Sequence, residues 1–87
     1  MTFKMRWYLY IAQCKDGSLY TGITTNPARR AKEHNSGIGA KSLSGKLPVK
    51  LVYKEGYNSK IDAAKREREI KGWRREKKLL LVRKGLP

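Results

Sequence analysis

The chain has 87 residues, of which 21 are lysine or arginine and 7 are aspartate or glutamate, so its formal net charge is +14. This length allows one small domain and excludes a dinucleotide-binding fold or a site for a large buried cofactor. Because Cys14 is the only cysteine, a disulfide framework and a cysteine-built zinc site are excluded as well. The charge indicates a polyanionic partner, most simply nucleic acid, since solubility alone needs a net charge of only about 2–8.

The sequence lacks the usual signs of export or membrane insertion. No apolar run approaches the roughly 18 residues of a membrane-spanning helix, and residues 1–7 lack the apolar stretch of a signal peptide. A single cysteine also suits a reducing compartment. We therefore expect a cytoplasmic protein with no membrane partner.

Local patterns predict a small α+β domain with the element order ββαβαα. Residues 7–13 and 19–24 are rich in aromatic and β-branched residues, which predicts two strands joined by a tight turn. A third strand is predicted over residues 49–57. We expect these strands to form a three-stranded antiparallel sheet flanked by helices, within one domain over residues 1–87.

The first helix is predicted from its start and stop signals. Asn26 followed by Pro27 is a good helix start, and the helix should continue to about Asn35 before Gly37 ends it. Residues 36–47 then form a Gly-, Ser- and Lys-rich loop that is long for so small a protein. Loops of this length without structure of their own are usually functional or mobile.

Two further helices are predicted after the third strand. The first of them should start from a cap at Asn58 or Ser59 and continue to about Lys71, where Gly72 breaks it. The last should extend from Trp73 to about Arg83. Its apolar residues are expected to help close the core: Leu79, Leu80 and Val82.

The basic excess is concentrated in two regions of the chain. Residues 25–50 hold six basic residues against one acidic residue, residues 60–87 hold eleven against four, and Lys54 and Glu55 cancel between them. A solvated, solubilising surface is the simpler alternative, but the size of the excess favours contact with phosphates. The residues assigned to such contacts are Arg29, Lys32, Lys41, Lys46, Arg74 and Lys77.

The turn between the first two strands decides whether two tyrosines share a face of the sheet. A two-residue turn would place Tyr10 and Tyr20 on opposite faces, whereas a three-residue turn pairs Tyr10 with Gly22 and places both tyrosines on one face. The turn residues Lys15-Asp16-Gly17 favour the second register, because a type I turn followed by a left-handed glycine is common there. We therefore predict two phenol hydroxyls beside free space over Gly22. The alternative is that both tyrosines are ordinary core residues.

Arg30 and His34, the only histidine, lie one helical turn apart on the same side of the first predicted helix. Arginine suits a phosphodiester because its permanently charged, planar fork can bind two oxygens. A neutral histidine nearby can accept or donate a proton. The alternative is that this helix is simply a solvated basic helix.

Glu67 is the acidic residue of the C-terminal helices that we expect to face the sheet. It shares a helical stripe with Ala63, Ala64 and Ile70, whereas Glu69 should face solvent. An inward carboxylate is costly unless it is paired or bound to a cation. Glu67 is therefore a candidate ligand for one Mg²⁺, which takes one or two carboxylates and completes its shell with water and phosphate. The alternative is a salt bridge to Arg30 or to a nearby lysine.

Taken in order, these residues resemble the GIY-YIG nuclease family, in particular its small stand-alone UPF0213 members. Tyr8-Leu9-Tyr10 and Tyr20-Thr21-Gly22 correspond to the two signatures, with Tyr8 in place of Gly and Thr21 in place of Ile, as is common in the small subgroup. The segment from Asn26 to Arg30 matches the helix motif that follows, and the segment from Arg66 to Lys71 matches the region of the family's metal-binding glutamate. The resemblance covers roughly residues 6–83.

The resemblance implies a metal-dependent endonuclease that hydrolyses phosphodiester bonds in DNA, including branched or single-stranded DNA. One option is a structure-selective enzyme of DNA repair or recombination. It implies Mg²⁺ or Mn²⁺ on Glu67, activation of water by Tyr10 directly or with His34, and positioning of the phosphate by Tyr20 and Arg30. Since members usually gain specificity from an additional domain, specificity here is expected from DNA shape or from a protein partner.

Two alternatives without catalysis stay open. One is a nucleic-acid-binding module of the same fold that is held on its partner by charge alone. The other is a scaffold that recruits a partner protein. Convergence of the catalytic candidates on one cleft would favour the enzyme over both, whereas a Glu67 that points to solvent or lies far from Arg30 would count against it. These candidates are Tyr10, Tyr20, Arg30, His34 and Glu67.

Overall fold

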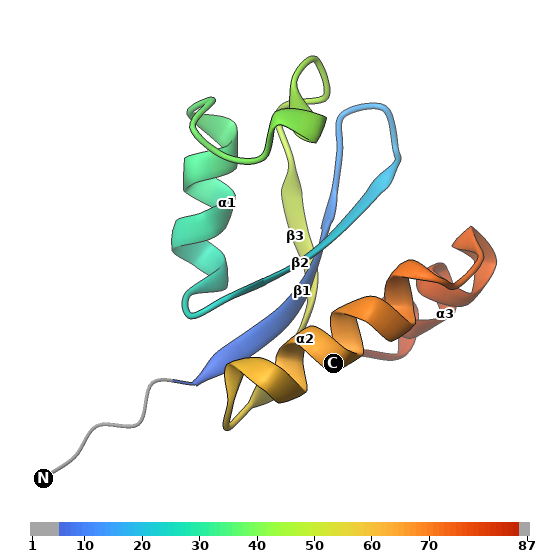
Figure 1. Ribbon diagram of the computed structural model, residues 1–87. Helices are drawn as coiled ribbons and strands as arrows, with labels where there is room; N and C mark the ends of the chain where they lie inside the picture. The colour runs from blue at the N-terminus through green and yellow to red at the C-terminus, as the bar shows by residue number, and fades with distance from the viewer. Residues whose placement is uncertain (1–5, 86–87) are drawn as a thin grey trace, which may run out of the picture.

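The core of the fold is a three-stranded antiparallel sheet with helices on both faces, as a computed structural model that describes residues 6–85 shows (Figure 1). The strands follow the order β2-β1-β3, so β1 is central and β2 and β3 are edge strands. Their bounds are β1 Trp7–Gln13, β2 Leu19–Thr24 and β3 Lys50–Tyr57.

Three α-helices and one 3-10 helix complete the chain. Their bounds are α1 Pro27–Asn35, η1 Lys41–Leu43, α2 Lys60–Lys71 and α3 Arg75–Gly85. The predicted α+β class and the order ββαβαα are therefore confirmed. The stretch used to judge a signal peptide lies mostly in residues 1–5, outside the described residues. Within residues 6–85, no helix combines the length and apolar character needed to cross a bilayer.

Two element boundaries differ from the expectation. The loop predicted over residues 36–47 contains η1, a single short turn of helix. The last helix begins at Arg75 and not at Trp73, because the backbone N–H of Trp73 donates to the carbonyl of Ile70 at 2.9 Å and so belongs to the end of α2. The carbonyl of Arg74 then accepts the first hydrogen bonds of α3.

The hairpin of β1 and β2 has the predicted three-residue turn. Gly17 has a φ of +87°, its N–H donates to the carbonyl of Cys14 at 2.9 Å, and the N–H of Cys14 donates to the carbonyl of Ser18 at 2.8 Å. A left-handed glycine at this position is what such a turn requires. The register pairs Tyr10 with Gly22, as predicted.

The central strand is buried on both of its faces. Leu9 and Ile11 pack with Ile70 beneath α2 and α3, and Tyr10 packs with Leu43 on the side of α1 and η1. Figure 1 shows the same division, with α1 and η1 on one side of the sheet and α2 and α3 on the other. Strand β1 therefore contributes buried residues to the apolar clusters on both faces of the sheet.

One expectation about the core was wrong. The side chain of Leu80 is 52% exposed, whereas Leu81 and Val82 are the α3 residues that pack against Leu9 and Ile11. The residues Leu79, Leu80 and Leu81 point in three different directions around the helix, and Leu81 is the one that packs against the sheet.

A charged network fastens α2 to β3. The guanidinium of Arg66 donates from Nε and Nη2 to the two carboxylate oxygens of Glu55, at 2.9 and 3.1 Å, and Tyr53 and Tyr57 donate to the same carboxylate. Arg66 also lies 5.1 Å from the ring centroid of Trp73. Burial raises the pKa of Glu55, but the hydrogen bonds from Arg66 and the two tyrosines outweigh it, so that the pKa lies below its usual value of 4.5.

This network predicts a pH-dependent contribution to stability. Because the pKa of Glu55 is lowered in the folded state, its contribution is complete above about pH 4.5 and is lost as the pH falls through the folded pKa. Glu55→Gln is expected to lower the free energy of unfolding by about 2 kcal/mol at pH 7. Urea unfolding should show this difference shrinking toward pH 3. The control Glu69→Gln alters a 56% exposed partner of Arg66 and should change stability little. If Glu55→Gln lowers the free energy of unfolding equally at pH 7 and pH 3, the lowered pKa of Glu55 does not contribute to stability.

Candidate active site

Tyr10 and Tyr20 lie on the α1 side of the sheet, with ring centroids 6.1 Å apart. Tyr10 is 2% exposed, and its ring lies directly over Gly22. A Cβ atom at residue 22 would come within 2.8 Å of the Tyr10 hydroxyl. The free space expected over Gly22 is therefore filled by the ring of Tyr10, and glycine is needed there because of that close approach.

Helix α1 brings Arg30 and His34 to this face. Asn26 caps the helix by accepting from the N–H of Arg29 at 3.1 Å, and Pro27 begins it, as predicted. The helix packs across all three strands. His34 is 1% exposed, and its Nε2 lies 2.8 Å from the hydroxyl oxygen of Tyr10. The ring of Tyr20 stands edge-on to His34, with centroids 5.3 Å apart.

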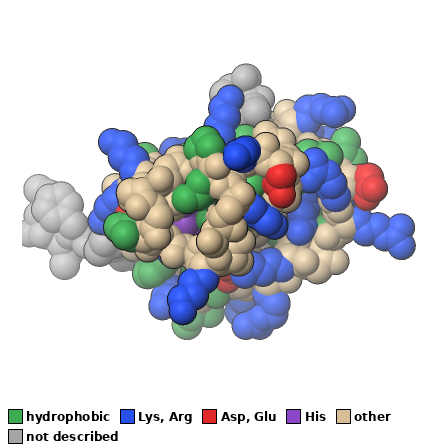
Figure 2. Space-filling model, turned by 90° about the horizontal axis from the view of Figure 1, so that it is seen from above, with side chains coloured by type: hydrophobic (Ala, Val, Ile, Leu, Met, Phe, Trp, Pro, Cys, Tyr) green, Lys and Arg blue, Asp and Glu red, His purple; other side chains and the backbone are tan. Residues whose placement is uncertain are grey.

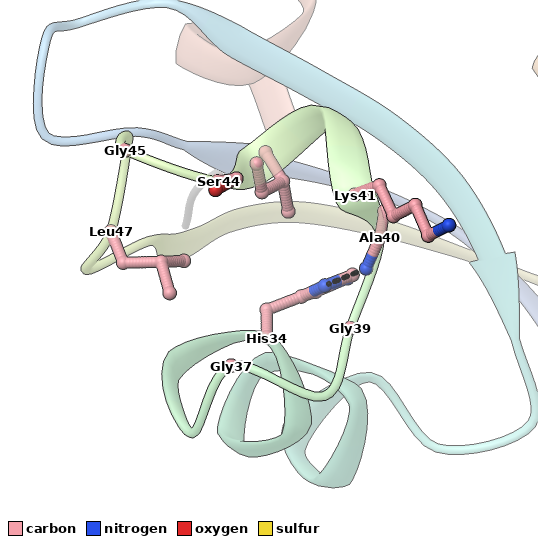
Figure 3. A pocket seen from close by; sticks show the side chains of 9 residues that line it. His34, Gly37, Gly39, Ala40, Lys41, Ser44, Gly45 and Leu47 are labelled. Atoms are coloured by element: carbon pink, nitrogen blue, oxygen red, sulfur yellow. Dashed lines mark hydrogen bonds between the residues drawn. The ribbon is translucent and has the colours of Figure 1, made fainter.

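The loop that follows α1 fixes the protonation of His34. The backbone N–H of Ala40 donates to Nδ1 of His34 at 3.3 Å, the contact drawn as a dashed line in Figure 3. Burial lowers the pKa of His34, Arg30 lowers it further, and Glu33 opposes them, so the ring is neutral at pH 7. Since Nδ1 accepts, Nε2 carries the hydrogen and donates to Tyr10. The hydrogen of the Tyr10 hydroxyl is then free for another acceptor.

Tyr10 itself is held as a phenol. Burial, and then the neighbouring Tyr20, raise its pKa to about 12, while the nearby guanidinium of Arg30 acts in the opposite direction. Arg30 is one-third exposed and donates from Nη1 to Glu33 at 3.1 Å. That hydrogen bond raises the pKa of Arg30, whereas burial lowers it. Arg30 therefore keeps its positive charge next to Tyr10.

The expected convergence is met by four of the five candidates, because Glu67 comes from the opposite side of the sheet. Its helix, α2, buries Ala63 and Ile70 against the face that holds Leu9 and Ile11. The Glu67 side chain is 24% exposed and pairs with Lys71 at 3.2 Å, so its partner is a nearby lysine and not Arg30. Within residues 6–85, no hydrogen bond or ion pair links Glu67 to the cluster around Tyr10, and no group of three His, Cys, Asp or Glu residues could hold a metal.

A pocket of about 410 Å³ opens beside His34, in the segment between α1 and β3 (Figure 3). The sequence predicted a functional or mobile loop here but no pocket. The glycines of this loop were the available signal for a pocket, since three of them line it and leave room that side chains would fill. Other lining residues are His34, Lys41, Leu43, Ser44 and Leu47.

The comparisons with known proteins identify the fold. Residues 6–79 match the model of the GIY-YIG catalytic domain. The chain belongs to the GIY-YIG family. It is also similar to UPF0213 proteins of Haloquadratum walsbyi and Staphylococcus saprophyticus, each 50% identical over 78 residues, which cover 90% of this chain and 88% and 95% of those proteins.

Two solution structures resemble this GIY-YIG domain. A UPF0213 protein from Bacillus halodurans superimposes with a TM-score of 0.61 at 49% identity, over 95% of this chain and 89% of the other. A protein from E. faecalis gives a TM-score of 0.63 at 38% identity, over 97% and 90%. The GIY-YIG family is one of endonucleases that generally depend on divalent metals, and DNA is the substrate that membership implies.

The basic side chains of the GIY-YIG domain do not form one surface. Arg29, Lys32 and Lys41 are exposed on α1 and η1, on the side of Tyr10, and Lys46 lies half-buried after them. Arg74 and Lys77 lie next to Trp73, on the side of α2 and α3. Figure 2 shows Lys and Arg side chains around the face that contains the histidine, with few acidic groups among them.

The hydrogen-bond pattern predicts a single tautomer for His34. Nitrogen-15 NMR of the imidazole should show Nε2 protonated and Nδ1 unprotonated at neutral pH. Ala40 has a φ of −65°, which proline adopts, so Ala40→Pro removes the donor N–H without requiring a new backbone angle there. The pKa of His34 should rise in Ala40→Pro and stay unchanged in the control Ala40→Ser. A proton on Nδ1 in the wild type would disprove the pattern.

Proposed function

We propose that this protein is a metal-dependent endonuclease that hydrolyses phosphodiester bonds in DNA. The observation that carries the proposal is the hydrogen bond between Tyr10 and His34, with Arg30 and Tyr20 beside it on one face of the sheet. A phenol, a neutral imidazole and a fixed guanidinium form a set of groups suited to a phosphate whose negative charge increases during attack.

Tyr10 and Arg30 have separate tasks in this proposal. Arg30 binds a non-bridging phosphate oxygen, and its charge favours the transition state because the negative charge on phosphorus grows there. The free hydroxyl hydrogen of Tyr10 orients the phosphate or the attacking water. To act as a base, Tyr10 first releases its hydroxyl proton to solvent water. The Nε2–H of His34 and the charge of Arg30 then stabilise the phenolate, which takes a proton from the attacking water. His34 acts as a donor and not as the base.

The donor chemistry of Glu67 fits one Mg²⁺ or Mn²⁺ ion. Its only recorded partner within the described part of the chain is Lys71, a half-exposed side chain that an ion can replace. Helices α1 and α2 both contact the edge strand β2, from its two faces. A bound ion would polarise the phosphate and stabilise the leaving oxygen, and water and phosphate would complete its coordination.

The charges around Tyr10 provide the DNA contacts of this proposal. Arg29, Lys32 and Lys41 lie on the same side of the sheet as the reacting groups, and Lys46 follows them in the loop, so these four are assigned to the strand that is cleaved. Arg74 and Lys77 face the other side and are assigned to a second stretch of DNA backbone. The specificity then comes from the shape of the DNA or from a protein partner, because phosphate contacts carry no sequence information.

Cleavage by single variants tests the proposal. With Mg²⁺ or Mn²⁺, the wild type should nick labelled flapped, branched or single-stranded DNA. Tyr10→Phe, Arg30→Ala and Glu67→Ala are each expected to lower the single-turnover rate by about 100-fold or more. Glu69→Ala is the matched control for Glu67, because it removes a carboxylate from the same helix at an exposed position, and it should retain the rate.

The alternatives give different results in the same assay. Salt-dependent DNA binding by the wild type, without cleavage in any divalent metal, would indicate a binding module and not an enzyme. Cleavage that is equal in the wild type and all three variants would show that another site or a contaminating enzyme is responsible. Loss of activity in Arg30→Ala but not in Glu67→Ala would remove Glu67 from the metal site.

A further inference from the structure

The segment that carries the pocket beside His34 is tied down near both of its ends by hydrogen bonds. The side-chain amide of Asn35 donates to the carbonyl of Val49 at 3.0 Å and accepts from its N–H at 2.7 Å, which ties the two ends of the segment together. The N–H of Lys15 donates to the carbonyl of Lys46 at 2.9 Å and fixes the segment to the hairpin. These hydrogen bonds hold both ends of the segment that carries the pocket.

The pocket shares a wall with the candidate active site. A Cβ atom at Gly39 would lie 2.0 Å from Nδ1 of His34, so the loop backbone packs directly against the histidine ring. The other nitrogen of that ring is bonded to Tyr10. A ligand in the pocket would thus lie against the same imidazole that is bonded to Tyr10.

The lining of the pocket fits a nucleotide. Leu43 and Leu47 provide apolar surface, and Lys41 and Ser44 provide a charge and a hydroxyl. The segment 36–47 contains no acidic residue. The volume of about 410 Å³ is near the lower end of ligand pockets, which extend over roughly 300–1,000 Å³, so one nucleoside unit fits and a duplex does not.

Two of the glycines that line the pocket, Gly37 and Gly45, border open space and have positive φ angles. A Cβ atom at Gly37 or at Gly45 would meet no atom within 4 Å, so the backbone at both positions borders open space. A flat base can approach the chain closely where no side chain projects. An unpaired base is available for such an approach, whereas a paired base must first leave the duplex at a cost in stacking and pairing.

From these observations, and resting on the proposed function, we infer that the pocket receives one unpaired nucleotide next to the phosphodiester held at Tyr10 and Arg30. The substrate class is then DNA with an unpaired nucleotide beside the cleaved bond, as in a flap, an overhang or a gap. Intact duplex is disfavoured because its bases cannot enter the pocket.

A binding assay without metal tests this inference separately from cleavage. Fluorescence anisotropy in EDTA should show the wild type binding a duplex with a single-nucleotide overhang about 5-fold more tightly than the blunt duplex of the same length. Ser44→Asp, which places a carboxylate at the pocket, should reduce this ratio to about 1. Ser42→Asp is the matched control, since Ser42 is an exposed residue of η1 that does not line the pocket, and it should keep the ratio.

A second measurement uses the unmodified chain. Titration of the ¹⁵N-labelled wild type with the dinucleotide thymidylyl-thymidine should shift the amide signals of Lys41, Ser44 and Gly45 first. Equal affinity for overhang and blunt duplex, or shifts confined to residues outside segment 36–47, would overturn the inference even if the enzyme cleaves DNA. A pocket preference without cleavage in any metal would instead support the inference and count against the proposed endonuclease.

Discussion

The hydrogen bond between Tyr10 and His34 is the contact on which the rest of this face depends. Both side chains are almost completely buried, so each polar atom would lack a partner if the bond were absent, at a cost of about 1–3 kcal/mol per group. The bond needs Gly22 beneath the phenol ring and the N–H of Ala40 behind the imidazole. It therefore ties β1, β2, α1 and the following loop into one unit, and the groups proposed for chemistry are also part of the core.

The sheet separates this unit from a second polar network that has a different task. On the side of α2, Arg66 and Glu55 pair with two hydrogen bonds, and two tyrosines complete the shell of the carboxylate. In a chain with so few acids, one of them is thus used to fasten a helix to the sheet. Glu67, on the same helix, pairs only with Lys71 within the described residues, and it is the carboxylate that we propose as the metal ligand.

Much of the fold followed from the sequence because short-range rules determine it. The residues Lys15-Asp16-Gly17 specified the turn, the turn specified the register, and the register placed Tyr10 beside Gly22. The spacing of Arg30 and His34 likewise predicted their common side of the helix. These steps need only the geometry of a strand, a tight turn or a single helix.

Other features depend on packing between distant segments, which the sequence does not display. The contact between Tyr10 and His34 requires the angle at which α1 crosses the sheet. Glu55 was counted only as cancelling Lys54, although the alternation of Tyr53, Glu55 and Tyr57 on one strand face was a signal for a shared network. The side on which a basic residue lies also depends on helix placement, so Arg74 and Lys77 were grouped with residues from which the sheet separates them.

The side-chain amide of Asn35 forms two hydrogen bonds with the backbone of Val49, one to its carbonyl and one from its N–H. A residue in an antiparallel sheet forms the same two bonds with its hydrogen-bonded partner. The two bonds of Asn35 close the intervening segment into a ring whose ends stay in place whatever the ring contains. Because the entropic cost of closing a loop rises only slowly with its length, the segment between Asn35 and Val49 can be replaced by shorter or longer segments at little cost in stability. An exchanged segment must still supply an apolar residue in place of Leu43, which packs against Tyr10, and a backbone N–H that reaches Nδ1 of His34. Recognition can then be altered by grafting while the reacting groups keep their positions.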